Sequence, residues 1–134
     1  MAIWVHSDVQ DNGLNEIKNN CNKLALISGY TANDSYATVN AAILAEATMA
    51  STDFTLSGAA GATRTLTTAS GKQDSSANAS NTTGQGGNNH FAFLNTAASK
   101  VLWITEETSN QDIFSGNQVN FPSLSLNSPQ PIAV

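Results

Sequence analysis

After residue 22, the apolar residues of this chain occur in short runs divided by small polar residues, and this pattern restricts the fold more than any other feature. From Phe54 onward, apolar and polar positions alternate within the runs, and Gly, Ser and Asn separate them, as in antiparallel β-proteins. We predict strands at Lys23–Ser28, Ala41–Met49, Phe54–Leu56, Thr63–Thr68, Phe91–Leu94, Val101–Thr105 and Asn117–Leu126. The length, 134 residues, suits one domain. The sequence therefore predicts a single mainly β domain over residues 1–134, an antiparallel β-sandwich or jelly roll, with one N-terminal α-helix.

Details of the runs refine this prediction. Phe91–Leu94 and Val101–Thr105 are almost entirely apolar, which predicts two central strands. In Asn117–Leu126 the alternation slips at Pro122, which predicts an edge strand or a bulge because proline cannot donate to a ladder.

Ala41–Met49 also has a helical composition, but a strand is favoured because another strand-like run follows almost at once. Residues 30–40 are polar and turn-rich. Within Thr63–Thr68, threonines at 63, 65 and 67 alternate with Arg64, Leu66 and Thr68.

The helix is predicted near the N-terminus, over about residues 8–22. Ser7 and Gln10 have the spacing of a capping box, with Ser7 as the N-cap. Apolar residues then recur at spacings of three, four and three. They are Leu14, Ile17, Cys21 and Leu24. This spacing places them on one face of a helix. At the other end of the chain, residues 128–134 are predicted to form an extended tail, because Pro129 and Pro131 cannot pair in a sheet.

Composition excludes several classes of function. Only 11% of the residues are charged, whereas 51 of the 134 are Asn, Ser, Thr or Gln, and the net charge is −5. A nucleic-acid-binding protein needs a basic footprint, so nucleic acid is not an expected partner. The longest nearly apolar run, Ala41–Ala50, contains Glu46 and is too short to span a bilayer, so no membrane association is predicted. No signal peptide is predicted, and one cysteine cannot build a disulfide framework, which fits synthesis in a reducing cytoplasm.

No residue pattern predicts catalysis, a cofactor or a metal site. His6 and His90 have no partner at metal-ligand spacing. Cys21 lies on the apolar stripe, where cysteine behaves as a small hydrophobe. Glu106, Glu107 and Asp112 form the densest acidic group, but their spacing is not that of a calcium loop. We therefore expect a protein that is not an enzyme.

Several segments resemble, in the same order, small and mostly unannotated proteins of tailed bacteriophages and prophages. These segments are Asp11–Asn15 running to Leu26–Ser28, Ala45–Met49 followed by Asp53–Leu56, His90–Leu94 followed by Val101–Thr105, and Ser115–Pro122. The resemblance covers most of the chain, and residues 74–89 depart from it by their richness in small polar residues. It implies a virion structural protein, specifically a capsid decoration (cement) protein, located on the capsid surface.

The resemblance also implies partners. The major capsid protein is expected to bind the chain, which is expected to be a homo-oligomer, with a trimer favoured. Candidate contact residues come from the chain ends and from the Asn-rich loop at residues 81–89. They are Trp4, His6, Asn81, Gln85, Asn88, Pro129 and Pro131. For Trp4, core packing is an equal alternative.

Three other functions stay open. The first is a tail or head–tail component of the virion. The second is a carbohydrate-binding or adhesive module, for which Tyr30 and Trp103 could supply aromatic rings. The third, an enzyme, would require three titratable side chains in one pocket.

Overall fold

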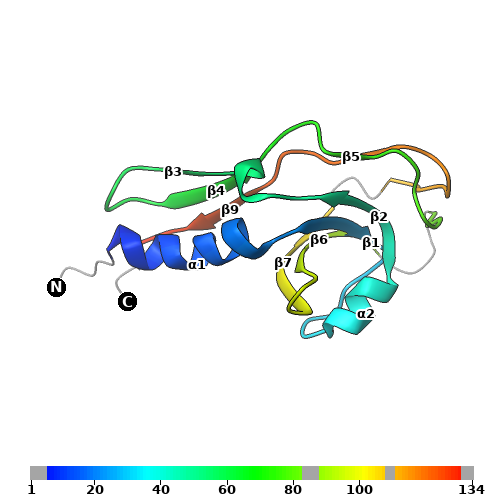
Figure 1. The fold of residues 1–134 in the computed structure, drawn as a ribbon, viewed down its shortest axis with the longest axis horizontal. Coiled ribbons are helices and arrows are strands. Elements are labelled where there is room, and N and C mark those ends of the chain that lie inside the picture. The colour runs from blue at the N-terminus through cyan, green and yellow to red at the C-terminus, as the bar shows by residue number, and fades with distance from the viewer. Residues whose placement is uncertain (1–5, 83–87, 108–110, 131–134) are drawn as a thin grey trace.

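The chain is mainly β, with antiparallel sheets and one main helix near the N-terminus, as the sequence predicts. The computed structural model describes residues 6–82, 88–107 and 111–130 (Figure 1). The helical elements are α1 (Ser7–Asn20), α2 (Tyr36–Ala41) and the 3-10 turn η1 (Ser51–Asp53). The strands are β1 (Lys23–Ile27), β2 (Ile43–Thr48), β3 (Phe54–Ser57), β4 (Arg64–Thr68), β5 (Gln73–Asp74), β6 (His90–Asn95), β7 (Lys100–Glu106), β8 (Val119–Asn120) and β9 (Ser125–Ser128).

A four-stranded antiparallel sheet, in the order β2–β1–β6–β7, forms one end of the elongated molecule. Side chains of β1 alternate between two hydrophobic clusters, one on each face of this sheet. The main cluster includes Leu24, Leu26, Phe91 and Phe93. The minor cluster consists of Ala25, Ile27, Val39, Ala92 and Leu94. Because both faces are covered, β1 and β6 carry almost continuous apolar sequence.

The prediction of two central strands is right for Phe91–Leu94 and wrong for Val101–Thr105. β6 lies between β1 and β7, whereas β7 is at the edge of the sheet, and most of its side chains are half-buried. The apolar residues of β7 instead pack at the borders of the two clusters, where Trp103 stacks on Phe93 with ring centroids 4.4 Å apart. Apolar content alone does not separate such an edge strand from a central one.

A short helix, α2, corrects the view of residues 30–40 as purely turn-rich. Ser35 caps it, since the Thr38 backbone N–H donates to the Ser35 hydroxyl at 3.2 Å. Val39, only 1% exposed, brings the helix onto the minor cluster. One buried valine in a polar segment gives too short a pattern for helical periodicity to be seen.

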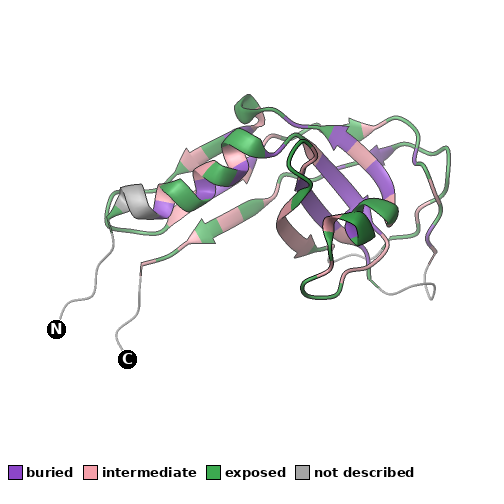
Figure 2. Cartoon of the chain, turned by 60° about the horizontal axis from the view of Figure 1, so that its bottom comes forward, coloured by how far each residue is buried: buried purple, intermediate pink, exposed green. Residues whose placement is uncertain are grey.

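The other end of the molecule is a three-stranded sheet, β3–β4–β9, with α1 along one face (Figure 2). The main cluster continues here, with Leu14 and Ile17 of α1 beside Phe54 and Leu66 of the sheet. In the connection from β3 to β4, Gly58 has φ of 109°, and a Cβ there would lie 2.2 Å from the Thr63 carbonyl oxygen. Only glycine fits that position.

The segment predicted as one last strand, Asn117–Leu126, is instead two strands in different sheets. β8 pairs with β5, and β9 pairs with β4. Pro122 lies between them, and the slip in alternation that it causes marks the change of sheet. Ser128, predicted to begin the tail, is the last residue of β9.

Helix α1 occupies residues 7–20 rather than 8–22, and the side chain of Gln10 is not used in the predicted capping box. Ser7 is the first helical residue. The side chain of Gln10 is 5% exposed and donates from Nε2 to the carbonyl oxygens of Ala62 at 3.2 Å and Ser128 at 2.7 Å. Gln10 therefore joins α1 to the β3–β4 connection and to the end of β9.

Candidate functional site

The outward face of the three-stranded sheet carries a regular array of uncharged polar side chains. Its members are Thr55, Ser57, Thr65, Thr67, Ser125 and Asn127, and we call this set the hydroxyl face. The register aligns them in two rows across the strands, Thr55–Thr67–Ser125 and Ser57–Thr65–Asn127. Paired side chains on one face of a sheet lie about 5 Å apart, so the array is a compact grid of five hydroxyls and one amide.

Hydrogen bonds within the rows hold the grid in order. The Thr65 hydroxyl donates to Oδ1 of Asn127 at 2.9 Å, and the hydroxyls of Thr67 and Ser125 are 3.2 Å apart. The donors and acceptors of these four side chains are therefore already ordered, so the binding of a partner costs little further side-chain entropy.

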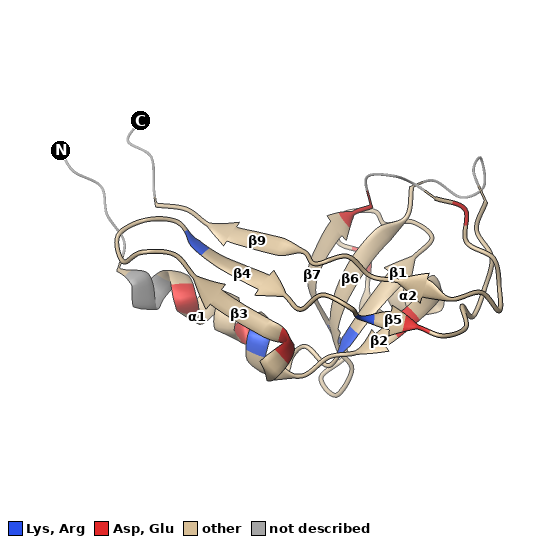
Figure 3. Cartoon of the chain, turned by 90° about the horizontal axis from the view of Figure 1, so that it is seen from above, with Lys and Arg blue, Asp and Glu red and all other residues tan. Residues whose placement is uncertain are grey.

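Charge is confined to the other side of this sheet. Arg64 is the one charged residue of β3, β4 and β9, and its guanidinium turns towards α1, where Nε lies 2.8 Å from Oδ1 of Asp11. This hydrogen bond raises the pKa of the Arg64 guanidinium. Lys18 of α1 likewise donates to the Phe54 carbonyl oxygen at 3.2 Å. Figure 3, which views the sheet from its outward side, shows the strands almost free of charge.

The sequence alone predicts only part of the hydroxyl face. The alternation of Thr63, Thr65 and Thr67 with apolar positions predicts a threonine face on one strand. Nothing in the sequence predicts that β9, 58 or more residues further along, continues the same rows.

Two of the contact residues predicted at the chain ends lie at the same end of the molecule as this sheet. His6 is exposed and precedes α1, and Pro129 is exposed and follows β9. Gln130 also reaches α1, since its Nε2 donates to Oε1 of Gln10 at 3.2 Å. Trp4, Gln85 and Pro131 lie outside the described residues.

Asn81 is a structural residue, and its prediction as a surface contact is wrong. It is 8% exposed, and its Nδ2 donates to Oδ1 of Asn89 at 2.6 Å. Asn89, 1% exposed, donates in turn to the carbonyl oxygen of Gln111 at 3.2 Å. This amide pair satisfies buried polar groups and fixes the ends of the Asn-rich loop. Asn88, in contrast, is exposed and donates to Oε1 of Glu106.

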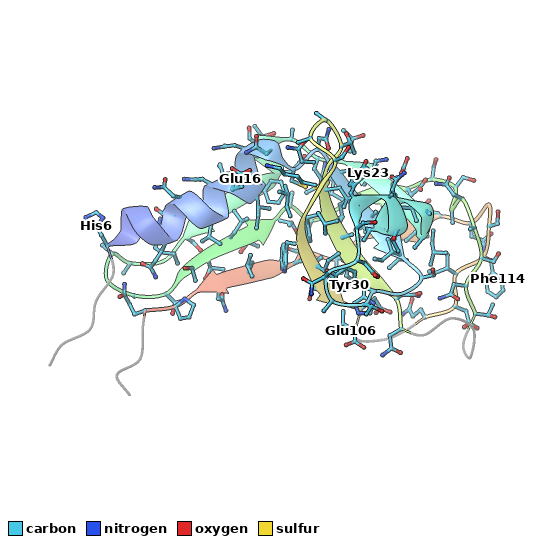
Figure 4. All side chains as sticks on the ribbon, turned by 90° about the horizontal axis from the view of Figure 1, so that it is seen from below. His6, Glu16, Lys23, Tyr30, Glu106 and Phe114 are labelled. Carbon is cyan, nitrogen blue, oxygen red and sulfur yellow. The ribbon has the colours of Figure 1, made fainter. Side chains whose placement is uncertain are left out.

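Asn88 lines a hollow of about 490 Å³ between the loop after β1, the start of β6 and the end of β7. The lining residues are Gly29, Tyr30, Thr31, Asp34, Asn88, His90 and Glu106, and we call it the Tyr30 hollow. Figure 4 shows Tyr30 and Glu106 on the same side of the molecule. The other aromatic residue considered for carbohydrate binding, Trp103, is stacked on Phe93 and packs against the main cluster.

A second hollow, of about 510 Å³, lies between the four-stranded sheet and β8. Its apolar floor is formed by Leu26, Phe91 and Phe121, which are only 3–5% exposed. Glu107 and Asp112 also line the hollow, and Glu107 accepts from the Gln111 backbone N–H at 3.2 Å.

Cys21 has a structural role in the main cluster. Cys21 is 3% exposed, and burial raises the pKa of its thiol to about 11, although hydrogen bonds to backbone groups oppose this rise.

Among residues 6–82, 88–107 and 111–130, no group of three or more His, Cys, Asp or Glu side chains could hold a metal ion. In the same part of the chain, no helix is long and apolar enough to cross a membrane.

Comparison of the chain with protein-family models, with curated proteins and with solved structures found no match.

Proposed function

We propose that this chain is a bacteriophage capsid decoration protein, bound through its hydroxyl face to the outer surface of the major capsid protein. The observation that carries the proposal is the hydroxyl face itself, a charge-free grid on a sheet fixed from behind by α1. The resemblance of several sequence segments to phage virion proteins supports the choice of partner.

An uncharged polar face suits a protein that must stay attached outside the cell. Salt screens contacts between exposed charges, with a Debye length of about 8 Å at 0.15 M, whereas hydrogen bonds between hydroxyls, amides and backbone groups depend little on ionic strength. Attachment through this face therefore survives changes of medium.

One hydroxyl face alone is too small for tight binding. Six short side chains cover much less than the roughly 800 Å² per partner of a stable interface. A cyclic homo-oligomer would repeat the contact, and linked contacts raise the overall affinity by about 10²–10⁴-fold. The small area of one face therefore supports an oligomer, with a trimer favoured. In this proposal the oligomer bridges neighbouring capsid subunits, and it stabilises the shell because it binds only the assembled form.

The position of the chain in purified virions tests the proposal directly. We expect peptide mass spectrometry of particles from the phage that encodes the chain to find it, and cryo-electron microscopy to show repeated density on the outer capsid. Density at the tail or at the head–tail junction would assign it there instead. Particles without the chain would refute the proposal.

Lysine variants test the face. We expect Thr67→Lys to weaken binding to particles that lack the protein at least tenfold, because it places an unpaired charge in a desolvated contact. The matched control is Ser75→Lys, at an exposed hydroxyl outside the face, which should bind like the wild type. Wild-type binding should change less than about threefold between 50 mM and 500 mM salt. Equal binding by Thr67→Lys would show that another surface makes the contact.

A further inference from the structure

We infer that the Tyr30 hollow binds a neutral hexose unit of a glycan. This site lies on the four-stranded sheet, away from the hydroxyl face, and the inference does not rest on capsid attachment. Its volume, about 490 Å³, is within the usual range for ligand sites, roughly 300–1,000 Å³.

The hollow is supported by the core. Tyr30 is half-buried and packs against the minor cluster. His90 is paired directly with Glu106 across β6 and β7, so both side chains project from the same face of the sheet. The rings of Tyr30 and His90 are 6.1 Å apart and inclined at 54°. The Tyr30 ring is held by the minor cluster and the His90 ring by its contact with the Asn88 carbonyl oxygen, so the two inclined rings offer a preformed surface for the C–H face of a sugar.

Three of the side chains that line the hollow, Asp34, Glu106 and His90, are each oriented by one hydrogen bond. Oδ2 of Asp34 accepts from the Thr31 backbone N–H at 2.8 Å, and Oε1 of Glu106 accepts from Asn88. Nδ1 of His90 lies 2.8 Å from the Asn88 carbonyl oxygen.

These bonds leave a second polar atom on each group for a ligand. In the described part of the chain, no hydrogen bond engages Oδ1 of Asp34, Oε2 of Glu106 or Nε2 of His90. The hollow is therefore rich in oriented acceptors.

The distribution of these acceptors favours a polyol. They come from three separate parts of the fold, namely the loop after β1, the start of β6 and the end of β7. A sugar ring carries several O–H donors on different atoms, whereas an ammonium group places its three donors on one atom. The two carboxylates, with no Lys or Arg among the described lining residues, repel acidic sugars.

A glycan array comparing neutral, amino-bearing and acidic glycans is the first test. We expect neutral hexose-containing glycans to bind, and sialylated or uronic-acid glycans to bind at least tenfold more weakly. Methyl glycosides of glucose, galactose, mannose and N-acetylglucosamine are then titrated by NMR, and the amide signals of Tyr30, Thr31 and His90 should shift.

Variants assign the binding to the hollow. Asp34→Asn and Glu106→Gln keep the side-chain shape, and each should weaken binding about tenfold. Tyr30→Ala should abolish it, whereas Tyr30→Phe, which keeps the ring and its packing, should stay within about threefold of the wild type. The matched control is Glu16→Gln, an exposed carboxylate on α1, which should bind normally. The inference is overturned if no glycan or methyl glycoside binds, if acidic glycans bind equally well, if methylguanidinium shifts these signals and sugars do not, or if the shifts map elsewhere.

Discussion

Replacing Gln10 by glutamate separates two accounts of the N-terminal helix. In a capping box, glutamate at this position would serve as well as glutamine, and its charge would favour the helix N-terminus. In the structure, however, Nε2 of Gln10 donates to the carbonyl oxygens of Ala62 and Ser128. A carboxylate has no N–H to donate and would place negative charge beside both oxygens.

The size of the effect follows from the burial of the site. Gln10 is 5% exposed, so water cannot replace the lost donors. Two lost hydrogen bonds at about 1 kcal/mol each, together with the desolvation of a charge between two acceptors, make a destabilisation of about 2–4 kcal/mol. For a chain of this size, that corresponds to a melting temperature lower by roughly 6–15 °C.

Thermal and urea unfolding, followed by circular dichroism, measure this difference. The matched control is Asn12→Glu, which adds the same carboxylate at an exposed position of α1 and should change the free energy of unfolding by less than about 0.5 kcal/mol. A Gln10→Glu variant as stable as the wild type would refute the role of Gln10 in joining α1 to β9.

Three further predictions concern the core and its titratable groups. Leu66→Ala, at a residue with 0% exposure behind the hydroxyl face, should lower the free energy of unfolding by about 2–5 kcal/mol in urea; a loss below about 1 kcal/mol would contradict this packing. Because burial raises the pKa of Cys21 to about 11, a thiol reagent at pH 8 should label the protein only after denaturation. Fast labelling of the folded protein would contradict the burial of this thiol. Burial raises the pKa of Asp53, but hydrogen bonds from Lys72 and the Ala50 N–H outweigh it and hold this pKa below its ordinary value. Such a carboxylate stabilises the fold above its unfolded-state pKa, about 3.9, and loses this effect as pH falls through the lower folded-state pKa. Asp53→Asn should therefore be less stable at pH 7 by about 1 kcal/mol or less, with a gap that closes in acid; a gap unchanged at pH 2 would exclude the ion pair as its source.

The sequence predicts most of the strands from local patterns. A strand covered on both faces is a continuous apolar run, whereas a strand covered on one face alternates between apolar and polar residues. Lys23–Ser28 and Phe91–Leu94 are continuous apolar runs and became β1 and β6. Ala41–Met49, favoured as a strand despite a helical composition, contains β2. Val101–Thr105 is correctly predicted as a strand, β7, but wrongly as a central one, since an edge strand that borders two clusters can have the same composition as a central strand.

The candidate sites were less predictable, because each assembles residues distant in the sequence. The Tyr30 hollow brings together residues near positions 30, 90 and 106. Its polar side chains have no recognisable spacing in the sequence, and of the two rings considered for sugar binding, Tyr30 and Trp103, only Tyr30 lies in the hollow. Asn81, predicted at the surface from its polar neighbours, is buried because Asn89 satisfies its amide.

The sequence by itself determined that this chain is a β-protein with one N-terminal helix, since hydrophobic periodicity is a local property that reflects which side of each segment meets the core. Only the tertiary structure decided that β9 extends the threonine rows of β4, that Gln10 joins the helix to that strand, and that Pro122 separates two sheets. These features depend on long-range pairing, in which the register between strands is set by the whole core and not by the residues of either strand alone.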